Sequence, residues 1–208
     1  MAATQRLTRK ERQAVTRASL TEAAARLCAQ RGLAGTSIEE IAAQAGYTKG
    51  AFYANFATKE DLFLTMLDEH FAERLREIDV ALGASDDPEV MARRAGDDFA
   101  RHVAADPIGQ RLFLEFAAHA SRDEAFREQL VSRYGTLRAR IAELLRRRAE
   151  ELGIQSPVPY DDLALMTFAM VNGFALERLL EPDVVPDDLG ATMLELFFAG
   201  LGTRMEQP

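Results

Sequence analysis

The fold is decided by residues 46–62, which have the sequence GYTKGAFYANFATKEDL. Phe52 and Phe56 are four residues apart, so on a helix they share one face, and we expect both to be buried. The rest of the helix surface then carries polar or cationic groups and one glycine: Thr48, Lys49, Gly50, Tyr53 and Asn55. Because a glycine is costly inside a helix, its presence here predicts a close approach of the backbone to another molecule.

Capping signals divide the surrounding sequence into short helices. Thr36-Ser37-Ile38-Glu39 matches a capping box with Thr36 as the cap, and Thr48 and Thr58 can cap the next two helices. Gly32 and Gly46 are suited to end the helices that precede these caps. Two short helices joined by a tight turn that contains glycine are typical of a helix-turn-helix motif.

Such short helices are not stable by propensity alone and need a shared core. A longer helix over residues 10–31 is predicted to supply one side of that core. The predicted core residues are Leu20, Leu27, Ile38, Ile41, Phe52 and Phe56.

The charge is distributed unevenly along the chain. Residues 1–60 contain nine basic and five acidic residues, a net charge of +4, whereas the remainder contains 16 basic and 28 acidic residues, a net charge of −12. A basic N-terminal region is expected in a protein that binds the phosphates of a nucleic acid with that end. Charged stretches are, however, also common on solvated surfaces.

Residues 10–71 resemble the N-terminal domain of TetR-family transcriptional regulators. The matching residues are Gly32, Thr36, Ile41, Ala42, Ala45, Gly46, Lys49, Gly50, Tyr53, Phe56, Lys59, Leu62 and Phe63. Cys28 departs from the family, which usually has a large aromatic residue there.

The resemblance implies that Lys49 to Phe56 is the recognition helix on double-stranded DNA. It implies that Tyr53 and Lys59 grip phosphate and that Thr48, Lys49 and Asn55 lie nearer base edges. The full predicted interface is Ser37, Thr48, Lys49, Gly50, Tyr53, Asn55 and Lys59. From the residues alone, Tyr53 could instead be a half-buried core aromatic, and Lys59 and Asn55 could be ordinary surface residues.

The rest of the chain is also predicted to be helical, which makes the fold all-α with about nine helices. Asp87-Pro88, Asp106-Pro107 and a capping box at Ser121–Glu124 are signals for helix starts, and Gly153 ends the long helix that follows. The predicted domains are a helix-turn-helix domain over 1–56, with a connecting helix from 58, and an effector-binding and dimerisation domain over 57–208.

Two apolar helices are predicted at about 160–180 and 187–204. Because they are apolar almost all round, they need cover on every side, and we expect a four-helix interface with a second copy of the chain. An unusually enclosed monomer core is the alternative. The longest apolar stretch, Leu163–Leu176, contains Asn172 and is shorter than the roughly 20 residues of a membrane span.

In the family, the helical body encloses a cavity for an effector, which we expect to be a largely apolar small molecule. The candidate lining residues are Phe99, His102, Phe113, Phe116, His119, Tyr134, Met166, Met170 and Phe174. Glu115 is predicted to pair with an arginine such as Arg138 or Arg140, because an unpaired buried carboxylate is costly. A polar point in the pocket is the alternative.

Catalysis, metal binding and a cofactor are not expected. His70, His102 and His119 lack metal-ligand spacing, and the sequence contains no phosphate-binding loop, dinucleotide fingerprint or nucleophile elbow. One cysteine and a polar, basic N-terminus favour a cytoplasmic protein, associated with the bacterial nucleoid if it binds DNA. The sequence predicts a ligand-responsive regulator, with a repressor favoured, that binds a palindromic operator. A helical ligand- or protein-binding module that no longer recognises DNA is the alternative.

Overall fold

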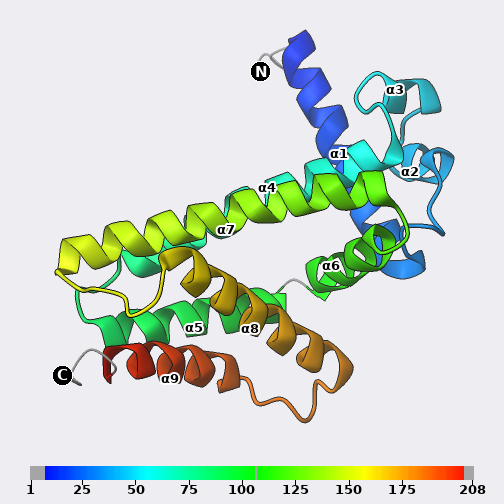
Figure 1. Ribbon diagram of the computed structural model, residues 1–208. Coiled ribbons are helices and arrows are strands. Elements are labelled where there is room, and N and C mark those ends of the chain that lie inside the picture. The colour runs from blue at the N-terminus through cyan, green and yellow to red at the C-terminus, as the bar shows by residue number, and fades with distance from the viewer. Residues whose placement is uncertain (1–7, 106, 204–208) are drawn as a thin grey trace, which may run out of the picture. The chain divides into compact units, whose positions relative to one another are not determined.

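The computed structural model describes residues 8–105 and 107–203. The side chains of residues 88–89, 92, 99–100, 102–105, 107–108 and 201–203 lie outside this description, as does Asp106. The described ranges contain nine helices and no strand, which confirms the predicted all-α class (Figure 1). The helices are α1 (Arg9–Arg31), α2 (Ile38–Gln44), α3 (Lys49–Tyr53), α4 (Lys59–Leu82), α5 (Pro88–Ala105), α6 (Pro107–Ala120), α7 (Glu124–Leu152), α8 (Tyr160–Leu180) and α9 (Leu189–Thr203).

The chain divides into two compact units, each built from two segments. The first unit contains residues 1–69 and 111–130, and the second contains residues 70–110 and 131–208. The first unit therefore joins α1, α2, α3 and the start of α4 to most of α6 and the start of α7. The compact units are not divided at residue 56, and the functional boundary predicted there stays a prediction.

The core of the first unit contains the side chains that the sequence pattern predicted. Leu20, Ile41 and Phe52 have no exposed surface, and Leu27 and Phe56 are 4% and 2% exposed. Ile38 is only half-buried. The core also takes in α4 and α6, because the rings of Phe63 and Phe116 lie 6.0 Å apart.

Side-chain caps define most helix starts in this unit, although two lie one or more residues from their predicted place. Ser37, not Thr36, caps α2: its hydroxyl accepts from the N–H of Glu40 at 3.2 Å, while the Thr36 hydroxyl donates to the carbonyl of Gly32. The side chain of Thr36 is buried, with 2% of its surface exposed, and its hydroxyl bonds to Gly32 rather than to the start of α2. Similarly, Asp123 rather than Ser121 caps α7.

In the second unit, α5 and α9 lie side by side (Figure 1). They approach closely at Gly96, where an added Cβ would lie 2.3 Å from the Cα of Ala191. Any larger residue at position 96 would therefore collide with the backbone of α9.

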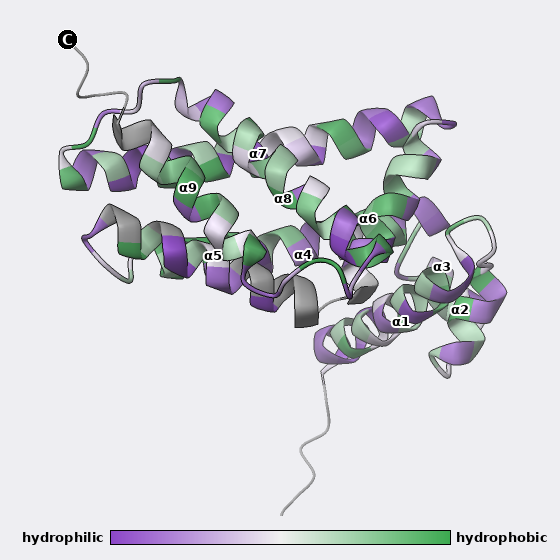
Figure 2. Cartoon of the chain, turned by 90° about the horizontal axis from the view of Figure 1, so that it is seen from below, coloured by the Kyte–Doolittle hydropathy of each residue, from purple (hydrophilic) through white to green (hydrophobic). Residues whose placement is uncertain are grey.

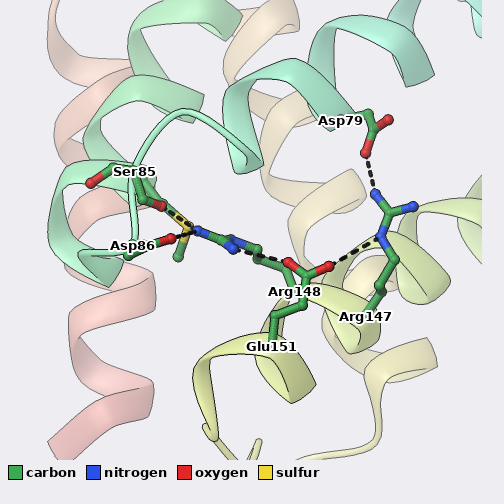
Figure 3. Close-up of polar contacts among 7 residues, drawn as sticks. Asp79, Ser85, Asp86, Arg147, Arg148 and Glu151 are labelled. Atoms are coloured by element: carbon green, nitrogen blue, oxygen red, sulfur yellow. Dashed lines mark hydrogen bonds and ion pairs between the residues drawn. The ribbon is translucent and has the colours of Figure 1, made fainter.

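The connection between α4 and α5 is held by Arg148 of α7 (Figure 3). Its guanidinium donates to the carbonyl of Ser85 and to the carboxylate of Asp86, both at 2.6 Å, and to Glu151 at 2.9 Å. The neighbouring Arg147 pairs with Asp79 of α4. These bonds tie α7 to the end of α4 and to the connection that follows it, which gives the cluster a structural role.

The helices α8 and α9 carry apolar residues along most of their surface (Figure 2). One side of α8 packs on α9 through Phe174 and Leu194, which are 8% and 3% exposed. Other large apolar side chains of this region are exposed: Leu165 50%, Met166 43%, Leu180 65%, Val184 68%, Leu189 44% and Leu196 68%. By length and composition alone, α8 could also cross a membrane.

Candidate nucleic-acid interface

The helices α2 and α3 are joined by a tight turn that requires glycine. Gly46 has a φ of +77°, and the next residue, Tyr47, donates its N–H to the carbonyl of Ala42 at 2.8 Å. The hydroxyl of Thr48 then caps α3 by accepting from Ala51 N–H at 3.2 Å. Regular helix ends at Tyr53, earlier than the predicted Phe56, although Phe56 N–H still bonds to the carbonyl of Phe52.

The buried and exposed sides of α3 are separated as its sequence predicted. Phe52 faces the core, whereas Thr48, Lys49 and Gly50 are exposed and Tyr53 is 52% exposed. The alternative of Tyr53 as a half-buried core aromatic is therefore wrong. Its ring lies edge-to-face with that of Phe52, at 5.6 Å between centroids. A polar flank on a helix anchored by phenylalanine has the form required to enter a major groove.

An open concavity of about 550 Å³ lies beside this flank. It brings together four of the seven predicted interface residues: Ser37, Lys49, Tyr53 and Lys59. Its full lining is Ala34, Thr36, Ser37, Ile38, Glu39, Lys49, Tyr53, Ala57, Thr58, Lys59 and Glu60. Hydroxyls, a phenol and two ammonium groups around one depression are suited to hold phosphate oxygens.

The ammonium of Lys49 is paired with the carboxylate of Glu39 on α2. Their hydrogen bond lowers the pKa of Glu39 and raises the pKa of Lys49. Because Lys49 opens α3, where the helix dipole disfavours a cation, Glu39 also offsets that cost. Glu39 is not among the predicted interface residues, because no helical period links residues ten apart on two different helices.

Lys59, at the first position of α4, is half-buried and oriented by backbone carbonyls. Its ammonium donates to the carbonyl of Leu33 at 2.8 Å and to that of Thr36 at 2.9 Å. Two of its three hydrogens are thus used within the protein, which leaves one for a phosphate. The phosphate role implied by the resemblance stays a prediction.

Asn55 lies away from the concavity and folds back on α3. Its Nδ2 donates to the carbonyl of Ala51 at 2.8 Å, while its Oδ1 is buried without a partner among the described residues. Arg17 of α1 fixes this end of the helix by donating to the Asn55 carbonyl at 2.5 Å and by stacking 4.2 Å from the centre of the Phe56 ring. Contact between Asn55 and a base stays a prediction.

The predicted pairing of Glu115 with Arg138 or Arg140 is wrong. Glu115 instead accepts from the N–H of Leu33, at 3.0 Å from its Oε2. The half-buried carboxylate therefore has a backbone hydrogen-bond donor in place of the predicted arginine. No residue spacing signals a bond between positions 33 and 115, so this contact was beyond the reach of sequence analysis.

The predicted effector-pocket residues fall in separate clusters of the structure. Phe116 and His119 belong to the first unit, where both rings pack on Phe126. In the second unit, Tyr134 packs between Phe71 and Phe168, at 5.2 Å from each ring, and burial raises the pKa of its phenol. Met170 and Phe174 pack against α9, Met166 is exposed and Phe113 is half-buried. The side chains of Phe99 and His102 lie outside the described residues.

Two family models match the chain. Residues 20–66 match the model of bacterial regulatory proteins of the tetR family. Residues 88–202, more than half of the chain, match the C-terminal model of BetI-type transcriptional repressors.

Curated relatives include both an activator and a repressor. The transcriptional activator FasR of Mycolicibacterium smegmatis is 32% identical over 53% of this chain and 48% of its own length. The transcriptional repressor SCO4008 of Streptomyces coelicolor is 27% identical over 76% of this chain and 77% of its own. The alignment spans only 48% of the length of FasR, and alignments with two regulators of Bacillus subtilis, YerO and YuxN, span only 27% and 26% of their lengths.

Solved structures share the fold at low sequence identity. A Rhodococcus sp. protein described as a TetR-family transcriptional regulator superposes with a TM-score of 0.76 at 20% identity, over 90% of this chain and 98% of its own. FadR of Bacillus subtilis, solved in complex with stearoyl-CoA, superposes with a TM-score of 0.72 at 14% identity, over 87% and 96%.

Proposed function

The chain belongs to the TetR family of bacterial regulatory proteins, and on that premise we propose that it regulates transcription by binding operator DNA. The observation that carries this proposal is the exposed polar flank of α3 beside a concavity lined by Lys49, Tyr53 and Lys59. The flank would enter the major groove, while the concavity would hold backbone phosphate.

The test measures affinity for a duplex taken from upstream of the protein's own gene, over a series of KCl concentrations. Lys49→Met and Tyr53→Ala should each weaken binding, and only Lys49→Met should flatten the salt dependence by about one phosphate contact. Arg127→Gln removes an exposed cation on α7 and is the control. If both interface variants bind the duplex with unchanged affinity and unchanged salt dependence, this surface does not bind operator DNA.

We further propose that the regulator is a homodimer formed through α8 and α9. The support is the set of exposed apolar side chains on these helices, among them Leu165, Leu180 and Leu196. Water contact with such a surface is unfavourable, and a second copy would bury it symmetrically. A dimer would present two recognition helices to successive major grooves, about 34–36 Å apart, on a palindromic operator.

Light scattering should give about twice the chain mass of 23.1 kDa. Leu165→Glu with Leu196→Glu should yield monomers, whereas Val131→Glu changes an exposed valine of α7 and should not. A wild-type monomer at micromolar concentration would refute the dimer. Partition of the wild type into lipid vesicles would show instead that lipid covers α8.

The regulator is proposed to act as a repressor that a largely apolar small molecule releases from DNA. Support comes from the match to a repressor model over residues 88–202 and from the fold shared with FadR. An effector that favours one conformation of the body shifts the population of the DNA-binding form. Stearoyl-CoA is therefore a suitable first probe: added to the protein–duplex complex, it should raise the dissociation constant, and palmitate tests whether the acyl chain alone suffices.

A further inference from the structure

The turn that precedes α2 is held from one side by Glu115 of α6. Its Oε2 accepts from Leu33 N–H at 3.0 Å, and the same oxygen lies 2.7 Å from where a Cβ on Gly32 would be. Gly32 also has a φ of +74°. Only glycine at position 32 therefore permits both the backbone conformation and the approach of the carboxylate.

The same turn is held from the other side by Lys59 of α4. Its ammonium bonds the carbonyls of Leu33 and Thr36, at 2.8 and 2.9 Å. Leu33 is therefore bound at both its N–H and its carbonyl, while its side chain, 1% exposed, is fixed in the core. The next residue after this turn, Ser37, is the cap of α2 and lines the concavity.

The two charged groups also share a common neighbour. The thiol of Cys28 has its pKa raised by burial and by the charge of Glu115, and lowered by the charge of Lys59. Both groups thus act over a short range within one partly buried region. Hydrogen bonds that involve a charged group are about twice as strong as neutral ones. The bonds from Glu115 and Lys59 therefore restrict the backbone of this turn more than neutral partners would.

We propose that Glu115 is a positioning residue for DNA binding: by holding Leu33, it places the carbonyls that orient Lys59 toward phosphate. This inference rests on the proposed function and deepens it, because it adds a residue of α6 to the DNA-binding machinery. Glu115 does not line the concavity and acts only through the backbone of the turn and through Lys59.

The experiment is a double-mutant cycle between Glu115→Met and Lys59→Met. Methionine matches glutamate in length and is one atom shorter than lysine. Binding to a 30-base-pair duplex is measured by fluorescence anisotropy over a KCl series. Each single variant should weaken binding roughly tenfold, the size of one lost hydrogen bond, and flatten the salt slope by about one contact. Because both changes disable the same ammonium, the double variant should bind as weakly as Lys59→Met alone.

Two further variants separate positioning from charge and from folding. Glu115→Gln keeps an oxygen that can accept from Leu33, so it should recover most of the affinity. Glu124→Gln removes the same charge from α7 and should bind like the wild type. Circular dichroism establishes that each variant is folded. If Glu115→Met is not folded, Glu115→Ala, which also removes the acceptor for Leu33 N–H, takes its place in the cycle.

Hydrogen exchange of the Leu33 amide gives a readout that needs no DNA. Exchange should accelerate in Glu115→Met and be restored in Glu115→Gln. Three results would each overturn the positioning role of Glu115. They are unchanged exchange of the Leu33 amide in Glu115→Met, unchanged affinity of that variant for the duplex, and a double variant whose loss of affinity is the product of the two single losses. If the wild type binds no duplex at low salt, the DNA-binding proposal fails, and Leu33 exchange still decides whether Glu115 holds the turn.

Discussion

The helices α2 and α3 are seven and five residues long and bury one face each, whereas α8 and α9 are 21 and 15 residues long and are apolar on most sides. In the first pair, individual side chains have separate tasks: Ser37 and Thr48 cap, Phe52 anchors, and Lys49 and Tyr53 face outward. In the second pair, Leu165 and Leu196 belong to an exposed apolar surface and have no separate task of this kind assigned to them.

This difference teaches where functional information lies in the chain. A short helix is stable only if caps and a few core contacts support it, so each residue of α2–α3 is constrained. A long apolar helix is constrained by the surface that covers it, and many sequences satisfy that requirement. DNA contacts can therefore be proposed residue by residue, while a partner surface is proposed only as a whole.

The largest effect should come from the anchor of the short helix. Phe52 has no exposed surface and packs against Phe56 at 5.7 Å between rings. Phe52→Ala should lower the free energy of unfolding by about 3–5 kcal/mol and abolish duplex binding, because α3 loses its support. Urea denaturation measures the first and anisotropy the second.

Its control is the neighbouring exposed position. Tyr53→Ala should cost only about 0.5 kcal/mol of stability and still weaken DNA binding. Equal losses of stability at positions 52 and 53 would break the comparison, because the short helix would then not be specified residue by residue.

The next prediction tests whether the second unit also contains a position at which only one residue type fits. Gly96→Ala places a methyl group 2.3 Å from the Cα of Ala191, so α5 and α9 must separate. We expect a loss of about 1–3 kcal/mol in thermal or urea denaturation. Gly135→Ala in α7, where an added Cβ meets nothing within 4 Å, should be neutral or should stabilise by up to about 1 kcal/mol.

Alkaline pH should weaken the first unit through Cys28. Burial raises the pKa of this thiol to about 12, above its ordinary value of 9.0, so the folded state keeps a proton that the unfolded state loses. The contribution to stability is complete below pH 9 and declines as the pH rises toward 12. At pH 10 the loss should be about 1 kcal/mol.

The measurement compares urea midpoints at pH 8 and pH 10 for the wild type and Cys28→Ala. Cys28→Ala should lack the loss of stability between pH 8 and pH 10 that comes from ionisation of the thiol. Identical declines in both proteins would show that the thiol ionises as easily in the folded state as in the unfolded chain.

The smallest effect concerns the ion pair on the recognition surface. Glu39→Gln frees Lys49 and removes a negative charge beside the concavity, so affinity for a mixed-sequence duplex should rise about threefold at low salt. Glu22→Gln breaks an exposed pair on α1 with the same change of charge and is the control. Equal gains in both variants would show a general charge effect rather than release of Lys49.

Much of the first unit could be predicted because its signals are local. The four-residue spacing of Phe52 and Phe56, the caps and the glycines at 32 and 46 predicted helices and buried faces that the structure contains. The choice between Thr36 and Ser37 as the cap could not be predicted, since both have a glutamate three residues later. Packing decided it by burying Thr36.

The sequence by itself determined the helical class, the short capped helices with Phe52 buried, and the basic N-terminal charge, because helical period, capping and charge are properties of neighbouring residues. The tertiary structure alone decided the partners of charged groups: Glu115 with Leu33, Lys59 with two carbonyls, and Lys49 with Glu39. The physical reason is that each bond depends on where separate helices meet. That arrangement results from packing the whole core, and no spacing along the chain encodes it.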